Sequence, residues 1–130
     1  MELDELREHL LGMPGSHESM PFDDEVLAYK VGGKIFALSR VDWIPVRVNF
    51  KCDPERALDL REEYPEAVLP GYHCNKKHWN TLVVADLPRD LVVELCQHSW
   101  DLIVASLTRK AKAELDAELA AEGPWDAPVI

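Results

Sequence analysis

Apolar residues recur along this chain at two spacings, one typical of helices and the other typical of strands. A spacing of three or four residues predicts helices over residues 2–12 and from Pro88 to about Leu107. Alternation of apolar and polar residues predicts strands over residues 26–31, 35–39, 43–51 and 79–85, with a short extended piece over 67–69. The pattern therefore predicts a chain that mixes helices and strands.

Turn and capping residues divide these segments. Gly32-Gly33 predicts a tight hairpin, because glycine tolerates positive φ. Asp53-Pro54 predicts the start of a helix that ends near Tyr64, and Thr108 is the expected cap of a last helix that reaches about Glu122. Residues 16–25 are expected to form a loop. The order is α-β-β-β-α-β-β-α with an added helix, which predicts a single α+β domain over residues 1–122 and an irregular tail over 123–130.

The two spacings also predict a core between the sheet and its helices. Apolar side chains on the inward stripes of the strands and helices should be buried together. They are Phe36, Leu38, Val46, Val48, Leu60, Leu91, Leu95, Leu102 and Ile103.

Charge adds a second feature to this picture. The formal net charge is −10, which disfavours non-specific attraction to nucleic acid. Residues 30–51, however, carry five basic side chains and one acidic, and residues 71–85 carry two basic side chains and no acidic one. One interpretation is a basic face on an acidic body. The alternative is that each segment has only a solvated polar face, with opposite charges interleaved in the fold.

Cysteines and apolar runs indicate the compartment. The chain has three cysteines, which are far apart and form no C-x-x-C pair, so a disulfide framework is disfavoured. The acidic start of the chain does not resemble a signal peptide, and no apolar run approaches the ~20 residues of a membrane span. We expect a cytoplasmic protein with no membrane association.

The densest chemistry lies in one run, Pro70 to Asn80, which reads PGYHCNKKHWN. Lys76 and Lys77 supply charge for phosphates, and Tyr72 or Trp79 could stack on a base. The side chains of Asn75 and His78 add polar contacts. Strand alternation places Arg47 and Lys51 opposite the core, where they could extend the patch. The candidate nucleic-acid or anion site is thus Arg47, Lys51, Tyr72, Asn75, Lys76, Lys77, His78 and Trp79. The alternative is a well-made turn, with Trp79 packed into the core from the start of a strand.

Two other kinds of site are disfavoured. His73, Cys74 and His78 are zinc-type ligands, but their spacing matches no standard zinc site and a fourth ligand is missing nearby, so we expect no bound metal. Cys52 or Cys74 with a histidine would make a nucleophile, yet cysteine is more often a small buried hydrophobe. His98 and Asp101 have a spacing that allows a side-chain pair on one helix face, although a satisfied surface histidine is the simpler interpretation.

Several separated motifs together resemble the MmcQ/YjbR family of small bacterial proteins, over roughly Leu3 to Lys112. They are PF at 21–22, KVGGKIFAL at 30–38, VNFKCDP at 48–54, PGYHCNKKHWNT at 70–81 and HSWDLI at 98–103. The resemblance implies a two-layer α+β fold like that of type III secretion chaperones, with a five-stranded antiparallel sheet backed by helices. It brings no catalytic residues and no cofactor, and it implies DNA as a partner. Thr108 stands where the family often has proline, which affects only the boundary of the last helix.

We therefore expect a monomeric, non-enzymatic binding module whose partner is DNA or another phosphate-bearing ligand. The alternative is a protein-interaction module, chaperone-like or dimerising, with no role in nucleic-acid binding. A continuous positive face with Arg47, Lys51, Lys76 and Lys77 would favour the first, and an exposed apolar sheet would favour the second.

Overall fold

The fold is a six-stranded antiparallel sheet with helices packed on it. The computed structural model describes residues 1–20 and 24–126, so the PF motif at 21–22 and residues 127–130 of the predicted tail lie outside the described residues. The elements in chain order are α1 (Leu3–Leu11), β1 (His17–Ser19), β2 (Val26–Val31), β3 (Lys34–Arg40), β4 (Arg47–Lys51), α2 (Pro54–Glu63), β5 (Val68–Pro70), β6 (Trp79–Val83), the 3-10 helix η1 (Val84–Asp86), α3 (Arg89–Ala105) and α4 (Arg109–Asp126).

The sheet has the strand order β1-β2-β3-β4-β6-β5. The sequence pattern predicts five strands, and the structure corrects this to six, because β1 lies within the predicted loop over residues 16–25. This strand is three residues long and has no alternation of apolar and polar residues, so the sequence pattern does not reveal it. It pairs with β2 at the edge of the sheet. The predicted α+β class and antiparallel sheet are confirmed.

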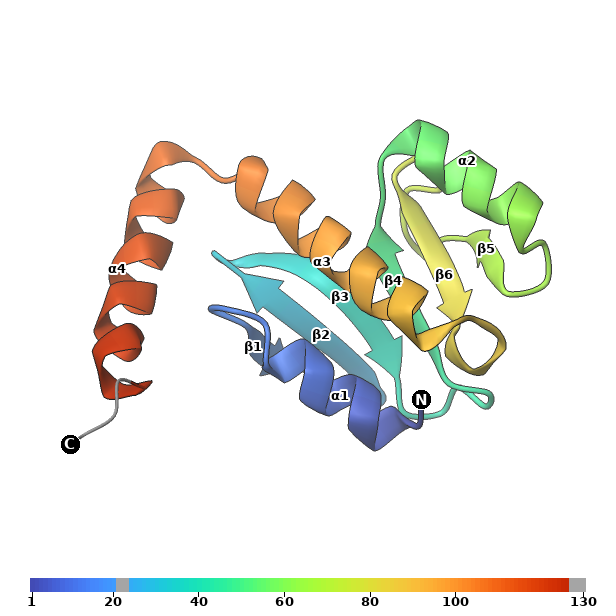
Figure 1. Cartoon of the computed structure of the whole chain (residues 1–130), viewed down its shortest axis with the longest axis horizontal. Coiled ribbons are helices and arrows are strands. Elements are labelled where there is room, and N and C mark those ends of the chain that lie inside the picture. The colour runs from blue at the N-terminus through green and yellow to red at the C-terminus, as the bar shows by residue number, and fades with distance from the viewer. Residues whose placement is uncertain (21–23, 127–130) are drawn as a thin grey trace.

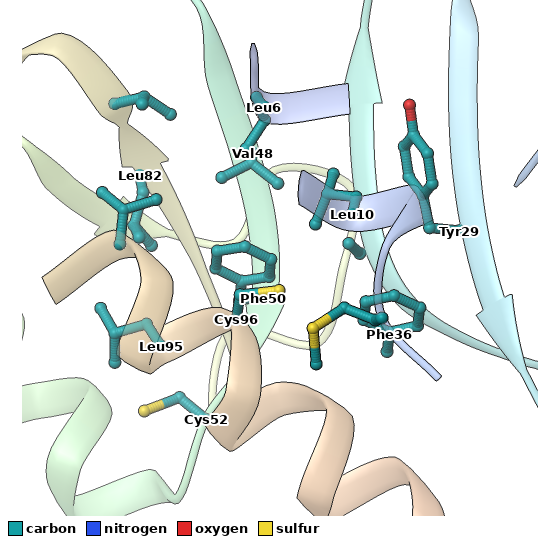
Figure 2. Close-up of a cluster of buried hydrophobic side chains, with 14 of the residues drawn as sticks. Leu6, Leu10, Tyr29, Phe36, Val48, Phe50, Cys52, Leu82, Leu95 and Cys96 are labelled. Atoms are coloured by element: carbon teal, nitrogen blue, oxygen red, sulfur yellow. The ribbon is translucent and has the colours of Figure 1, made fainter. Parts of the chain in front are cut away.

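Helices α1 and α3 cross one face of the sheet, and α2 lies beside β5 and β6 (Figure 1). Figure 2 shows the core between them, where Leu6 and Leu10 of α1 and Leu95 of α3 point toward Val48 and Phe50 of β4. All five side chains are buried. Burying each such side chain stabilises the fold by about 1.5–3 kcal/mol. The opposite face of the sheet, which α1 and α3 leave uncovered, is called the far face below.

The predicted core is mostly confirmed, with one clear exception. Phe36, Val48, Leu60, Leu95 and Ile103 are buried, and Val46 and Leu91 pack against the core while remaining partly exposed. Leu102 is also only partly buried. Leu38 is half-buried and pairs with Asn49, whose side chain lies on the far face, so Leu38 does not point into the core. The reason is a bulge at Phe36, which shifts the inward-outward alternation of β3 by one residue.

Three predicted boundaries also move. The strand predicted over residues 43–51 begins only at Arg47, and Ile44, counted as inward-facing by alternation, is 89% exposed. Pro45 lacks the N–H that a strand ladder needs, which explains the late start. The strand predicted to Ala85 ends at Val83 and continues as η1. Helix α4 runs to Asp126, past the predicted end near Glu122.

Helix α3 is joined to the sheet by polar contacts as well as apolar ones. The hydroxyl of Ser99 donates a hydrogen bond to the carbonyl of Phe36 (2.6 Å) and accepts one from the N–H of Lys51 (2.9 Å). Ser99 is completely buried, so it satisfies two backbone groups, one on β3 and one on β4, that water cannot reach. On the preceding residue of α3, Nε2 of His98 accepts a hydrogen bond from the N–H of Asp53 (3.1 Å). The side chain of Asp101 instead accepts from Gln97 (2.8 Å), so His98 and Asp101 form no pair.

A charged cluster fastens α1 to the short edge strand β1. The guanidinium of Arg7 donates to both carboxylate oxygens of Glu18 (2.7 and 2.6 Å), and the hydroxyl of Tyr29 donates to the same carboxylate (2.7 Å). The hydrogen bond from Arg7 is the main reason that the pKa of Glu18 lies below its usual range. Burial of Tyr29 raises the pKa of its hydroxyl, which therefore remains protonated and a hydrogen-bond donor at all ordinary pH values.

Replacing Glu18 with glutamine should lower the free energy of unfolding at neutral pH by about 1 kcal/mol, a modest value because Arg7 is half-exposed. The folded carboxyl has the lowered pKa, so its stabilisation is complete above the unfolded pKa and is lost as pH falls through the folded one. Urea unfolding from pH 7 to pH 3 should therefore show a difference between wild type and Glu18→Gln that shrinks with acidification. Glu5→Gln, which removes an exposed pair with Arg89, is the matched control and should leave stability unchanged. A difference that is constant with pH would contradict the assignment.

Candidate functional site

The loop of residues 71–78, called the binding loop below, is closed at its base by two backbone contacts. The N–H of Gly71 donates to the carbonyl of Trp79 (2.9 Å), and the N–H of Cys52 donates to the carbonyl of His78 (2.8 Å). A Cβ on Gly71 would lie 2.7 Å from Cβ of Trp79 and 2.8 Å from its carbonyl oxygen, so only glycine fits this close approach. The loop thus leaves the sheet through a fixed neck between β5 and β6.

Buried polar side chains on the far face hold the start of the loop in place. Asn49 of β4 is fully buried, and its amide donates to the carbonyl of Tyr72 (2.8 Å). The hydroxyl of Thr81 on β6 donates to Oδ1 of Asn49 (2.6 Å) and accepts from the N–H of Tyr72 (2.9 Å). Both backbone polar groups of Tyr72 are therefore satisfied by residues of the sheet. The residues at the loop start cannot move without breaking a buried network.

The other end of the loop is held by Arg61 of α2. Its Nε donates to the side chain of Asn80 (2.7 Å), and its Nη2 donates to the carbonyl of Lys76. Asn80 in turn donates to the carbonyl of Ala57 (3.3 Å), which ties β6 to α2. At the tip, Oδ1 of Asn75 accepts the N–H of Lys77 (2.9 Å) in a tight local turn. The loop is therefore ordered by the protein itself before any ligand binds.

With the backbone held, the loop presents its side chains to solvent. Tyr72, His73, Asn75, Lys76 and Lys77 are all exposed. Lys76 and Lys77 line a shallow hollow of about 410 Å³ beside α2, together with Pro54, Glu55, Leu58 and Arg61. Nζ of Lys76 has one long contact, to the carbonyl of Gly71 (3.4 Å), and within the described residues Nζ of Lys77 has no partner.

Strand β4 carries two further candidate cations on the far face. Its register places Arg47, Asn49 and Lys51 on one side and Val48 and Phe50 on the other, as the sequence predicts. Arg47 and Lys51 are four residues apart, or about 13 Å along the strand. Lys51 pairs with Trp79 across the sheet, and the loop passes between the two cations over Asn49.

The candidate cations differ from four arginines elsewhere on the body, which are paired with carboxylates. The arginines at positions 7, 40, 56 and 89 each lie within hydrogen-bond distance of a carboxylate. Among the described residues, no carboxylate lies within 4.0 Å of Arg47, Lys51, Lys76 or Lys77. Nε of Arg47 is buried and has no hydrogen-bond partner among the described residues. These four charges are thus available to an outside anion.

Sequence reasoning missed one aromatic residue of this site. Trp43, expected within a strand, lies in the β3–β4 connection with its ring centroid 5.7 Å from that of Tyr72, edge to face. The ring of His73 lies 4.1 Å from Tyr72, and the guanidinium of Arg47 lies 6.0 Å from the centre of the Trp43 ring. Trp79, in contrast, is half-buried on the far face and does not belong to the main core. Trp43 could not be assigned to this site from the sequence, because its contact with Tyr72 forms only when two loops that are far apart in the chain meet in the fold.

The thiols are poorly suited to nucleophilic chemistry. Burial raises the pKa of Cys52 to about 11 and of Cys96 to about 12, so both remain protonated at neutral pH. Cys74 Sγ accepts a contact from the amide of Asn49 (3.4 Å), and burial raises its pKa as well. In residues 1–20 and 24–126 no three of the His, Cys, Asp and Glu side chains cluster in a way that would bind a metal. No helix in these ranges is both long and apolar enough to cross a bilayer.

The structure defines a two-layer α+β domain that displays an ordered, cation-bearing loop beside one face of its sheet. The YjbR family model matches residues 11–102, and the chain belongs to this family. It is 36% identical over 102 residues to the Escherichia coli O157:H7 protein YbdF, covering 77% of this chain and 82% of that protein. It is 28% identical to YjbR of Escherichia coli K12 over 113 residues, covering 86% and 95%.

Two solved structures share the fold. The crystal structure of the Deinococcus radiodurans protein DR2400, a DUF419 domain, has a TM-score of 0.81 and 38% identity, covering 88% of this chain and 87% of that one. A protein from Pseudomonas syringae has a TM-score of 0.66 at 18% identity, covering 78% and 98%, which supports the fold alone.

Proposed function

We propose that this protein is a non-enzymatic module that binds DNA with the binding loop and the adjacent far face of β4. The observation that carries the proposal is the set of four cations, Arg47, Lys51, Lys76 and Lys77, that have no carboxylate within 4.0 Å in the described part of the chain. Phosphate oxygens would supply the missing partners. Because the body is strongly acidic, we expect weak binding that depends steeply on salt.

The rigidity of the loop supports the same conclusion. A flexible lysine-bearing loop would lose backbone and side-chain entropy on binding, which lowers affinity. Here Asn49, Thr81 and Arg61 have already fixed the backbone. Only the side chains of Lys76 and Lys77 need to be ordered when a phosphate approaches.

Changing Lys76 and Lys77 together to alanine should weaken DNA binding most at low salt and flatten its salt dependence. Each lost phosphate contact lowers the slope of log affinity against log salt by about 0.7 for a single strand and about 0.9 for a duplex. The double variant should thus lose about 1.4–1.8 from the slope. Fluorescence anisotropy of a labelled oligonucleotide between 20 and 200 mM salt would measure it.

The matched control is the double variant Lys110→Ala/Lys112→Ala, which removes the same charge from exposed positions on α4. It should leave both affinity and slope close to wild type. If the two double variants weaken binding equally, the effect comes from net charge and the loop is not the site. Absence of any binding at 20 mM salt would also refute the proposal. Circular dichroism of both variants should be unchanged, because exposed lysines contribute little to stability.

The alternative is a protein-docking module, and one observation favours it. Ile44 in the β3–β4 connection is 89% exposed, and Val41, three residues earlier in the same connection, is also exposed. Apolar side chains that project in this way often mark contact surfaces. Sedimentation of the purified protein across a range of concentrations would reveal a dimer formed through this connection, which Ile44→Ser would dissolve.

A further inference from the structure

The rings beside the binding loop point to the form of nucleic acid that the site accepts. Three neighbouring rings, called the aromatic patch below, lie on the far face: Trp43, Tyr72 and His73. They come from two separate loops, since Trp43 and Tyr72 are 29 positions apart in the chain. Tyr72 is 49% exposed although its neighbours are aromatic. Exposed, fixed rings beside cations are the recurring surface on which unpaired bases stack.

The position of Tyr72 is set by the backbone rather than by its own side chain. Its N–H and C=O are held by Thr81 and Asn49 at 2.9 and 2.8 Å. His73 follows with φ of 56°, an unusual value for a residue other than glycine, and its imidazole lies against the tyrosine ring. The ring of Tyr72 is therefore kept at the surface by the fold. A residue that served only to pack would have no reason to be held half in solvent.

One cation lies next to the aromatic patch, and two more belong to the same binding loop. Arg47 is 6.0 Å from the centre of the Trp43 ring and lacks a carboxylate within the described residues. Lys76 and Lys77 follow Tyr72 in the same loop. Ile44, almost fully exposed, adds an apolar contact next to Trp43. Rings and an apolar side chain for bases, with cations for phosphates, match the two chemical parts of a nucleotide.

We infer that the site prefers single-stranded over duplex nucleic acid, an inference that rests on the function proposed above. In a duplex the base faces are stacked on one another, so Tyr72 and Trp43 would gain nothing, whereas the dense phosphate charge would meet an acidic protein. In a single strand the bases can leave the stack and lie on the rings. The aromatic patch then supplies binding that the net charge of the protein does not oppose.

The test compares a non-self-complementary DNA 15-mer with the duplex made from it, at 50 mM salt, on the whole chain. The single strand should bind at least about fivefold more tightly, since one stacked base contributes a factor of roughly 5 to 150. Tyr72→Ala should weaken single-strand binding by about that factor and leave duplex binding unchanged. Tyr72→Phe, which keeps the ring, should restore it. Leu11→Ala removes another exposed apolar side chain, from α1 over the opposite face, and should have no effect.

The outcomes separate this inference from the proposed function. If duplex binds as tightly as single strand, and Lys76→Ala/Lys77→Ala weakens both, DNA binding stands and the single-strand preference is refuted. If neither form binds, both are refuted. If Tyr72→Ala or Ile44→Ser alters self-association and not DNA binding, the aromatic patch is a protein contact and the inference fails. Unchanged thermal unfolding of Tyr72→Ala would confirm that the variant is folded.

Discussion

Replacing Asn49 with alanine should lower the free energy of unfolding by about 2–4 kcal/mol and release the binding loop. The amide joins three partners, the carbonyl of Tyr72, the hydroxyl of Thr81 and the thiol of Cys74, at a site with no solvent exposure. Truncation leaves the carbonyl and the hydroxyl without these bonds, and an unsatisfied buried polar group costs about 1–3 kcal/mol. Urea unfolding monitored by circular dichroism would measure the loss.

Asn49→Ala should weaken DNA binding more than the loss of a single DNA contact would. The released loop would have to become ordered on binding, and this ordering costs free energy. Asn75→Ala is the control, since Asn75 is exposed and, within the described residues, its side chain bonds only the N–H of Lys77. Asn49→Asp keeps the volume of the side chain but removes its donor, so it should be at least as harmful as alanine. If Asn49→Ala were no more destabilising than Asn75→Ala, the network would not be what fixes the loop.

Ser99→Ala should cost about 2–3 kcal/mol, the second largest effect that the structure predicts. Its hydroxyl is the partner of the Phe36 carbonyl and of the Lys51 N–H, and all contact with water is blocked. Without the hydroxyl, the Phe36 carbonyl of β3 and the Lys51 N–H of β4 each lose a hydrogen bond, at the point where the two strands separate. Hydrogen exchange should show faster exchange of the Lys51 amide, in addition to the lower unfolding free energy.

The control for this substitution lies in the residue that caps the same helix. The hydroxyl of Ser106 also donates to a backbone carbonyl, that of Ile103 in α3 (2.7 Å), but Ser106 is exposed and water can replace the bond. Ser106→Ala should therefore change the unfolding free energy by less than about 0.5 kcal/mol. Equal losses for Ser99→Ala and Ser106→Ala would show that Ser99 does not bridge β3 and β4 in solution.

Much of the fold follows from local patterns, and the exceptions have identifiable causes. The Gly32-Gly33 hairpin and the Asp53 cap, which accepts the N–H of Arg56 at 3.2 Å, are settled by adjacent residues, so the sequence predicts them. Strand β1 escapes prediction because its place is decided by partners on α1 and β2 that are distant in the chain. Leu38 is misassigned because a bulge at Phe36 is invisible to a strict period of two.

The candidate site divides in the same way. The identity of its cations was predictable, since alternation places Arg47 and Lys51 on one face and composition concentrates Lys76 and Lys77 in one run. The network that orders the loop was not, because it depends on the register of β4 against β6, which brings Asn49 opposite Thr81. Trp43 was missed for a similar reason, as its contact with Tyr72 joins two loops.

The closed neck of the binding loop has a consequence for how this family can diversify. The neck at Gly71 and Trp79, together with the sheet residues that hold Tyr72, carries the structural constraints, while the side chains of residues 75–77 meet solvent. Those three side chains therefore lie outside the contacts that fix the neck. What the loop touches can change one substitution at a time while the neck keeps its geometry.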